Sequence, residues 1–238
     1  MKKRIIALIL TLILALTLVP SALADDTTVS NPAQVLKFGL RGGHGPMSIT
    51  KGTLHGNYRV REVYLVCLSG ANLSFTRKDN FDAFFASALS IHSEYYATAK
   101  KNILKTVPDG ANIIFAGHSA GGNVAQQLAC DSTIRAKYTI INTLACGSPE
   151  VIAIGREGTL HRLCDALDPV PYISLAFPAN FFLEISYQWG DYSKLQNPHA
   201  DSYYNEKAWS NFDCLGNRNG VSYFTCNYND CVSFSLKR

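Results

Sequence analysis

The feature that most constrains the fold is an apolar run, Ile113–Ala116, that opens into the pattern GHSAG at residues 117–121. A buried strand that ends in G-x-S-x-G presents its serine on a strained strand-to-helix turn, where only glycines at the flanking positions avoid clashes. Residues 123–129 are compatible with the helix that should follow. The helix N-terminus favours developing negative charge. We therefore predict that Ser119 is a nucleophile; the alternative is a Gly/Ser turn without chemistry.

The first 24 residues have the composition of a secretory signal peptide. Basic residues at positions 2–4 precede an apolar stretch over 5–19, and the sequence ALA at 22–24 supplies a small-x-small cleavage site. The apolar stretch is shorter than the roughly 20 residues that span a membrane. We predict cleavage near Asp25 and an exported, secreted protein.

Residues 25–238 have the length of one α/β domain. They hold 19 basic and 18 acidic residues, because the predicted signal peptide accounts for three basic residues and no acidic one. This near-neutral balance lacks the electrostatic footprint of a nucleic-acid-binding protein.

All seven cysteines follow the predicted signal peptide, and an odd number leaves at least one outside a disulfide. Those in apolar surroundings are expected to be small buried hydrophobes: Cys67, Cys130, Cys146 and Cys164. Three cysteines form a C-terminal cluster, and two of them could form a disulfide in an exported protein: Cys214, Cys226 and Cys231. Ligand spacing typical of a metal site is lacking, so no metal is predicted.

Strand-like and helix-like stretches alternate along the chain. The expected strands are Val60–Leu68, the run at 113–116, Tyr138–Ala145 and Thr159–Leu163, and the expected helices are Phe81–Leu89, about 91–104 and the stretch after Ser119. This alternation predicts an α/β fold with a mostly parallel sheet and helices on both faces. Residues 25–32 are expected to be loose, and glycine-rich residues 40–58 to form turns and short strands.

A serine hydroxyl needs a base, usually a histidine oriented by a carboxylate. In the order serine, acid, histidine, the downstream candidates for the base are His161, on a predicted strand, and His199, in a loop before a helical stretch. We predict His199, and the alternative is a surface histidine. His118 is expected to be structural.

Two aspartates compete for the role of the acid. Asp168 precedes the sequence PVP, whose prolines stiffen a loop leaving the strand end, and we predict that it orients the base. Asp165 is the alternative, more simply explained as a turn residue, and Asp191 is a third candidate. The oxyanion hole is predicted to use the N–H of Ala120 and that of Ala71, with Gly70 as an alternative to Ala71.

With these residues placed, the sequence from about Val60 to Tyr204 resembles the fungal-type (class 3) lipases of the α/β-hydrolase superfamily. The matching segments are LSGA at 68–71, HSEYY at 92–96, GHSAGG at 117–122, LACGSP at 144–149, DPVP at 168–171, and a late histidine near tyrosines at 199–204. The resemblance implies Ser119, Asp168 and His199 as nucleophile, acid and base. Ser69 and Ala71 depart from the family's R-G-T turn, so a hydroxyl that assists the oxyanion hole in some members is missing.

The resemblance implies an α/β-hydrolase fold and a secreted serine hydrolase that cleaves carboxylic esters of acylglycerols or related lipids through an acyl-enzyme, without a cofactor. Its partners would be a lipid or other small ester and, transiently, a lipid surface. Phe81–Leu89 is a candidate lid or a core helix, and Ala176–Trp189 a candidate acyl groove or a strand. Two alternatives are a non-catalytic secreted binding module, and an acyltransferase or peptidase with the same three residues.

Overall fold

The computed structural model describes residues 26–41, 46–57, 59–70, 93–149, 155–172, 185–188 and 198–235. Several predicted features lie outside these residues: the signal peptide, the Phe81–Leu89 helix, Ala71, Asp191 and most of Ala176–Trp189. Within the described residues, no helix is both long and apolar enough to cross a membrane.

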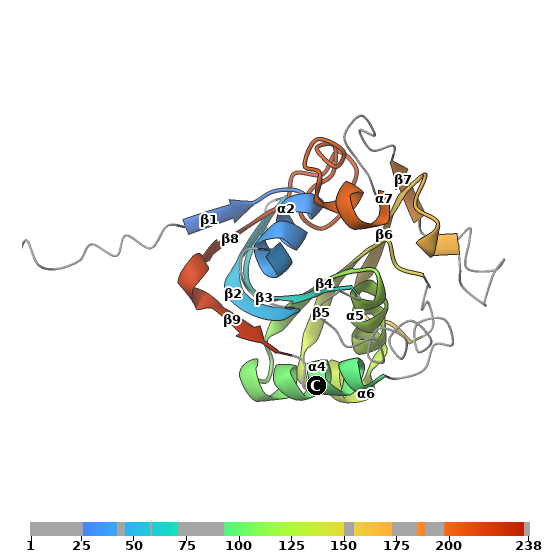
Figure 1. The fold of residues 1–238 in the computed structure, drawn as a ribbon. Helices are drawn as coiled ribbons and strands as arrows, with labels where there is room; N and C mark the ends of the chain where they lie inside the picture. Colours follow the sequence, from blue (N-terminus) through green and yellow to red (C-terminus); the bar gives the residue numbers. More distant parts are fainter. Residues whose placement is uncertain are drawn as a thin grey trace, which may run out of the picture.

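Nine strands form one mixed sheet in the order β1-β8-β2-β3-β4-β5-β6-β7, with β9 pairing with β2 beside β8 (Figure 1). The strands are β1 Asp26–Val29, β2 Met47–Gly56, β3 Arg59–Leu68, β4 Asn112–His118, β5 Thr139–Cys146, β6 Thr159–Asp165, β7 Ile185–Gln188, β8 Tyr223–Asn227 and β9 Cys231–Phe234. Strands β3 to β7 are mutually parallel. The pairings among β1, β2, β8 and β9, and that of β2 with β3, are antiparallel.

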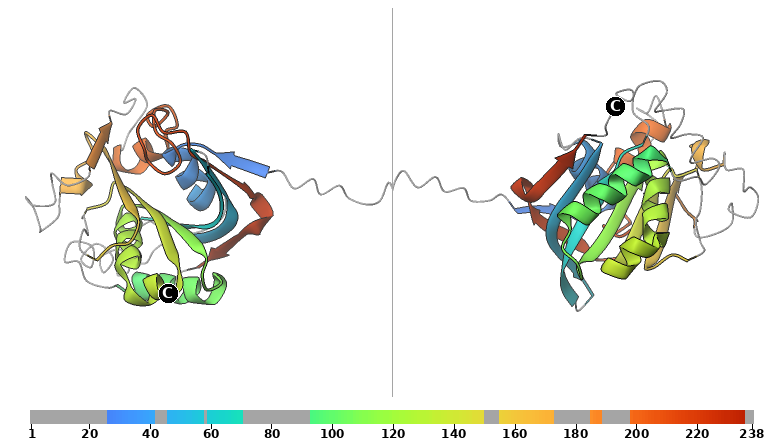
Figure 2. Two further views of the ribbon diagram at one scale, coloured as in Figure 1. Left: turned by 180° about the vertical axis from the view of Figure 1, so that it is seen from behind. Right: turned by 90° about the horizontal axis from the view of Figure 1, so that it is seen from below.

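The described helical segments pack on both faces of this sheet (Figures 1 and 2). They are α2 Pro32–Leu36, the π-helical η1 Lys37–Arg41, α4 Glu94–Thr106, α5 Ala120–Cys130, α6 Ser132–Lys137, α7 Pro198–Asp201, and the short turns η2 Val170–Tyr172, η3 Ser202–Tyr204 and η4 Tyr228–Asp230. Alternate residues of β3 and β4 point to opposite faces. One face packs against α2 and the C-terminal segment, the other against α4, α5 and α6. The α/β class predicted from the sequence is therefore the class of the structure.

Local sequence explains where several helices begin. The Ser93 side chain accepts a hydrogen bond from the Tyr96 N–H at the start of α4, and Asn31 precedes Pro32 and caps α2 in the same way. The helix expected from about residue 91 therefore begins at Glu94.

Two expectations for the N-terminal part were wrong. Residues 26–29 form β1 rather than a loose segment, because they pair with β8 from the far end of the chain. The glycine-rich stretch holds a single ten-residue strand, β2, instead of short strands. Gly52 is required there, since an added Cβ would lie 2.3 Å from the Phe224 ring on the neighbouring strand.

The seven thiols are all free, so none of the three candidate C-terminal cysteines is in a disulfide in the structure. Cys226 lies on β8 and Cys231 on β9, whereas Cys214 lies in the preceding loop. Burial raises the pKa of the Cys226 thiol to about 12, which disfavours the reactive thiolate at neutral pH.

Candidate active site

The turn between β4 and α5 holds Ser119 in an unusual backbone conformation. Its φ is 57° and its ψ is −127°, and only Asn219 shares a positive φ among the described residues other than glycine. The Ser119 N–H donates to the Cys146 carbonyl of the neighbouring strand at 2.8 Å, which holds the turn against β5. Strained residues of this kind are concentrated at functional sites.

The glycines of the motif are required by close backbone approaches. A Cβ on Gly121 would lie 2.2 Å from the Leu68 carbonyl oxygen, and one on Gly117 would lie 2.3 Å from the Gly121 carbonyl oxygen. At the end of β3, a Cβ on Gly70 would lie 2.7 Å from the Ser119 Cβ. The end of β3 therefore passes directly beside Ser119.

His199 lies between Ser119 and Asp168. Its Nε2 is 2.9 Å from Ser119 Oγ, and its Nδ1 is 3.0 Å and 2.9 Å from the two carboxylate oxygens of Asp168. A carboxylate only accepts hydrogen bonds, so we assign the proton of the neutral ring to Nδ1 and the lone pair to Nε2. In this tautomer Nε2 accepts the Ser119 hydroxyl proton.

The two competing aspartates have different partners although both are fully buried. Asp168 contacts His199, and it also accepts hydrogen bonds from the Val170 N–H at 2.9 Å and from the Tyr203 hydroxyl at 2.6 Å. Asp165 instead accepts from the Leu167 N–H at 2.9 Å and from the Ser202 hydroxyl. Only Asp168 is placed to orient the histidine.

Tyr203 was not singled out by the sequence. Its hydroxyl donates to Asp168 and accepts from the Asp165 N–H at 3.0 Å, and its ring stacks on Trp209 with centroids 5.7 Å apart. Burial, followed by the nearby Asp168 charge, raises the pKa of Tyr203, so the hydroxyl stays protonated as a donor. Its position four residues after His199 in one helical stretch was the available signal.

The other site predictions have different outcomes. Ala120 begins α5, where main-chain N–H groups lack partners within the helix. Ala71, predicted to supply the second oxyanion donor, lies outside the described residues. His161 bonds Asn142 at 2.8 Å through Nδ1, away from Ser119.

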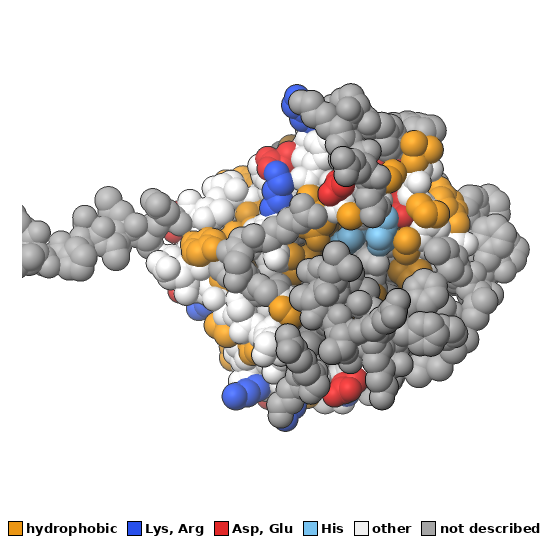
Figure 3. Space-filling view, in the orientation of Figure 1, with side chains coloured by type: hydrophobic (Ala, Val, Ile, Leu, Met, Phe, Trp, Pro, Cys, Tyr) orange, Lys and Arg blue, Asp and Glu red, His pale blue; other side chains and the backbone are white. Residues whose placement is uncertain are grey.

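The surface around the histidines is largely apolar where it is described (Figure 3). Hydrophobic side chains border the pale-blue histidine surface near the centre of that face. Leu167, in the turn between the two aspartates, is 53% exposed. His199 itself keeps 22% of its side chain exposed, whereas Asp168 has none.

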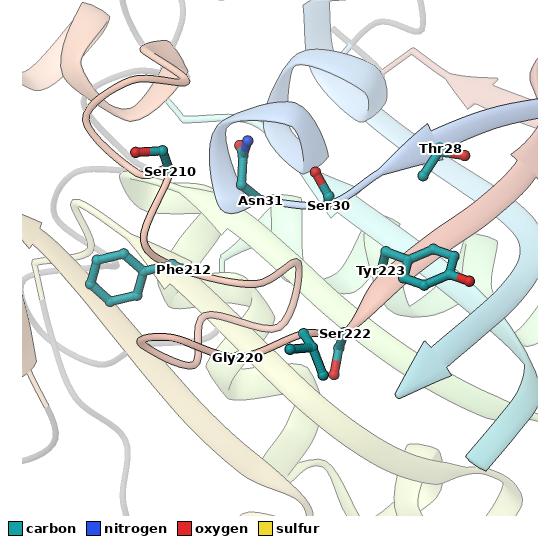
Figure 4. A pocket seen from close by; sticks show the side chains of 9 residues that line it. Thr28, Ser30, Asn31, Ser210, Phe212, Gly220, Ser222 and Tyr223 are labelled. Carbon is teal, nitrogen blue, oxygen red and sulfur yellow. The ribbon is translucent and has the colours of Figure 1, made fainter. Parts of the chain in front are cut away.

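A separate open groove of about 580 Å³ lies between the start of α2, the loop before β8 and β8 itself (Figure 4). Its lining is mostly hydroxyl and ring groups, and it includes Ser30, Ser210, Phe212, Ser222 and Tyr223. None of the predicted site residues lines this groove.

Comparisons with known proteins add no assignment. No protein-family model, curated protein or solved structure matches the chain. In the part of the chain that the structure describes, no three His, Cys, Asp or Glu side chains gather as metal ligands.

Proposed function

We propose that the protein is a secreted serine hydrolase with an α/β-hydrolase fold that cleaves carboxylic esters. The observation that carries this proposal is the hydrogen-bonded series Ser119–His199–Asp168, with both distances near 2.9 Å and the serine on a strained turn. A serine, a histidine and a buried carboxylate in this geometry are the elements of nucleophilic acyl transfer. The parallel strands β3 to β7 and the flanking helices support the proposed fold.

In the proposed reaction, Ser119 Oγ attacks the ester carbonyl carbon while His199 Nε2 takes the hydroxyl proton. Asp168 accepts the Nδ1–H bond and stabilises the imidazolium that forms. The oxyanion is bound by the Ala120 N–H, with the Ala71 N–H as the predicted second donor. His199 then gives its proton to the leaving alcohol, and an acyl-Ser119 remains.

Deacylation repeats these steps with water as the nucleophile. The oxygen of the water molecule attacks the acyl carbon while His199 takes a proton from that water. The proton then passes to Ser119 Oγ as the carboxylic acid leaves. Every proton is carried by His199, so the sequence of steps needs no metal or organic cofactor.

We propose acylglycerols or related lipid esters as the substrate class, with transient contact to a lipid surface. The apolar side chains bordering the histidines support an acyl chain near Ser119. The resemblance of the motifs to class 3 lipases points to the same chemistry.

The test is hydrolysis of p-nitrophenyl esters from acetate to palmitate by the protein purified without residues 1–24, beside its Ser119→Ala variant. We expect hydrolysis that is lost with Ser119, together with labelling of Ser119 by a fluorophosphonate probe. The chain-length optimum measures the length of any acyl groove. Equal background rates and no labelling in both proteins would contradict the proposal and favour a binding module.

A further inference from the structure

His118 is the residue before Ser119, at the end of β4, and the proposed mechanism gives it no role. Its side chain is almost fully buried, with 8% of the residue exposed. Its Nε2 lies 2.8 Å from the main-chain carbonyl oxygen of His199. The residue that precedes the nucleophile therefore contacts the backbone of the base.

The partner atom fixes the chemistry of this bond. A carbonyl oxygen only accepts, so His118 Nε2 carries a proton and donates it. The ring packs against the rings of His199, Tyr203 and Tyr204, with centroids 4.8, 5.3 and 5.5 Å away. With Nε2 occupied, His118 is not placed to replace His199 as the base.

The base needs such a support because of where it lies. His199 is the second residue of α7, a four-residue helix whose residues are only partly buried. Asp168 holds one ring nitrogen of His199. This contact restrains the ring alone, so a shift of the His199 backbone would still displace the ring from Ser119. Catalytic groups must be held within about 0.5 Å of their working positions.

We propose that His118 is a positioning residue for the base. Its Nε2–H···O=C bond to His199 joins the backbone of the base to the residue that adjoins the nucleophile, and so maintains the distance between Ser119 Oγ and His199 Nε2. This inference rests on the proposed function. His118 acts through His199 and does not itself contact the reacting atoms.

The test compares three substitutions of His118. In His118→Gln the amide nitrogen reaches about as far as Nε2 and is also a donor. In His118→Phe the ring contacts are kept and the donor is removed, and in His118→Asn the amide is too short to reach the carbonyl. Displacement of a catalytic group by about 1 Å costs on the order of 100-fold in rate.

We therefore expect kcat for a p-nitrophenyl ester to fall about 10- to 100-fold in the Phe and Asn variants, with KM nearly unchanged. The Gln variant should recover most of kcat. The rate of Ser119 labelling by a fluorophosphonate should follow the same order, because it reports activation of the serine without turnover. Circular dichroism melts establish that each variant is folded.

The outcomes separate this inference from the proposed function. If Ser119→Ala is as active as the unsubstituted protein, the proposed function fails, and the positioning role fails with it. If Ser119→Ala is inactive but the Phe and Asn variants keep full kcat, only the positioning role is overturned. Equal losses in folded Gln, Phe and Asn variants would also overturn it, because the donor would then not be what matters.

Discussion

The two edges of the parallel part of the sheet differ in how their residues are held. At the carboxyl ends of β4 and β6 lie Ser119, with its positive φ, and the fully buried carboxylates of Asp165 and Asp168. At the amino ends, the partly exposed Lys137 side chain bonds Asp109 at 2.7 Å, and Asp131 caps α6. Ligand sites of open parallel sheets lie at the carboxyl edge.

This difference indicates that the carboxyl edge holds groups whose conformation or burial lowers the stability of the fold. A residue in a sparsely populated backbone region costs of order 1–3 kcal/mol, and burial of a carboxylate is unfavourable unless it is fully hydrogen-bonded. The amino edge shows helix caps and surface ion pairs, which stabilise without strain. Substitutions that disturb the Ser119–His199–Asp168 series at the carboxyl edge should therefore change activity, whereas those at the amino edge should change stability alone.

The largest expected effect is that of Asp168→Asn. An amide at this position no longer selects the Nδ1–H tautomer of His199, and kcat should fall by about 10⁴. Asp165→Asn is the matched control, since it lies on the same edge without contacting His199. We expect it to lower the free energy of unfolding by about 1–3 kcal/mol and to keep most of kcat. Similar kcat losses in both variants would contradict the assignment of Asp168 as the acid.

A second test places a methyl group at the turn. In Gly121→Ala the new Cβ would lie 2.2 Å from the Leu68 carbonyl oxygen, so α5 has to move away from β3. We expect a loss of about 1–3 kcal/mol of stability and slow fluorophosphonate labelling of Ser119. In the control Gly56→Ala the nearest atom is Ser222 Oγ at 3.4 Å, and both quantities should stay near those of the unsubstituted protein. An unchanged labelling rate in Gly121→Ala would show that the close packing of α5 against the end of β3 does not matter for Ser119.

A matched pair of tyrosines compares the two edges directly. Tyr203→Phe removes the hydroxyl that donates to Asp168 and leaves the Asp165 N–H without its acceptor. We expect a loss of about 1–3 kcal/mol of stability and roughly a tenfold lower kcat. Tyr138→Phe, at the amino edge, removes only a bond to the Val107 carbonyl, so the melting temperature should drop while kcat does not. If Tyr138→Phe lowered kcat as much as Tyr203→Phe does, the proposed difference between the two edges would be wrong.

The smallest effect concerns the pH dependence of stability at the amino edge. Burial raises the pKa of Asp131, but hydrogen bonds from Lys100, Tyr96 and the Ile134 N–H outweigh it, and the net pKa is lowered. A carboxyl with a lowered folded-state pKa stabilises the fold above its unfolded pKa, and the contribution disappears as pH falls through the folded value.

Asp131→Asn keeps the helix cap and removes the charge. We expect the variant to be less stable near neutral pH, with the difference shrinking toward about pH 3. Urea unfolding at both pH values measures this, and ester hydrolysis should be unchanged. A difference in stability that is constant with pH would show that the charge of Asp131 is not the cause.

The sequence by itself determined the local parts of this protein. Strand β4, the glycines around Ser119 and the start of α5 follow from residues that are adjacent in the chain, because apolar runs and flanking glycines act through neighbouring backbone atoms. The parallel strands β3 to β6 follow from the alternation of apolar runs with helical stretches. The α/β class was predictable for the same reason.

The tertiary structure alone decided which distant groups meet. The acid Asp168 and the base His199 were predicted from their order after Ser119 and from the PVP sequence. Only the tertiary structure shows the pairing of β1 with β8, the contact of Tyr203 with Asp168 and that of His118 with His199, which join residues some 35 to 200 positions apart. Such contacts leave no periodic signal in the sequence, because they depend on how packed elements are placed and not on the preferences of adjacent residues. The three central residues of the site were therefore predictable from local motifs and chain order, whereas the contacts that support them depend on packing.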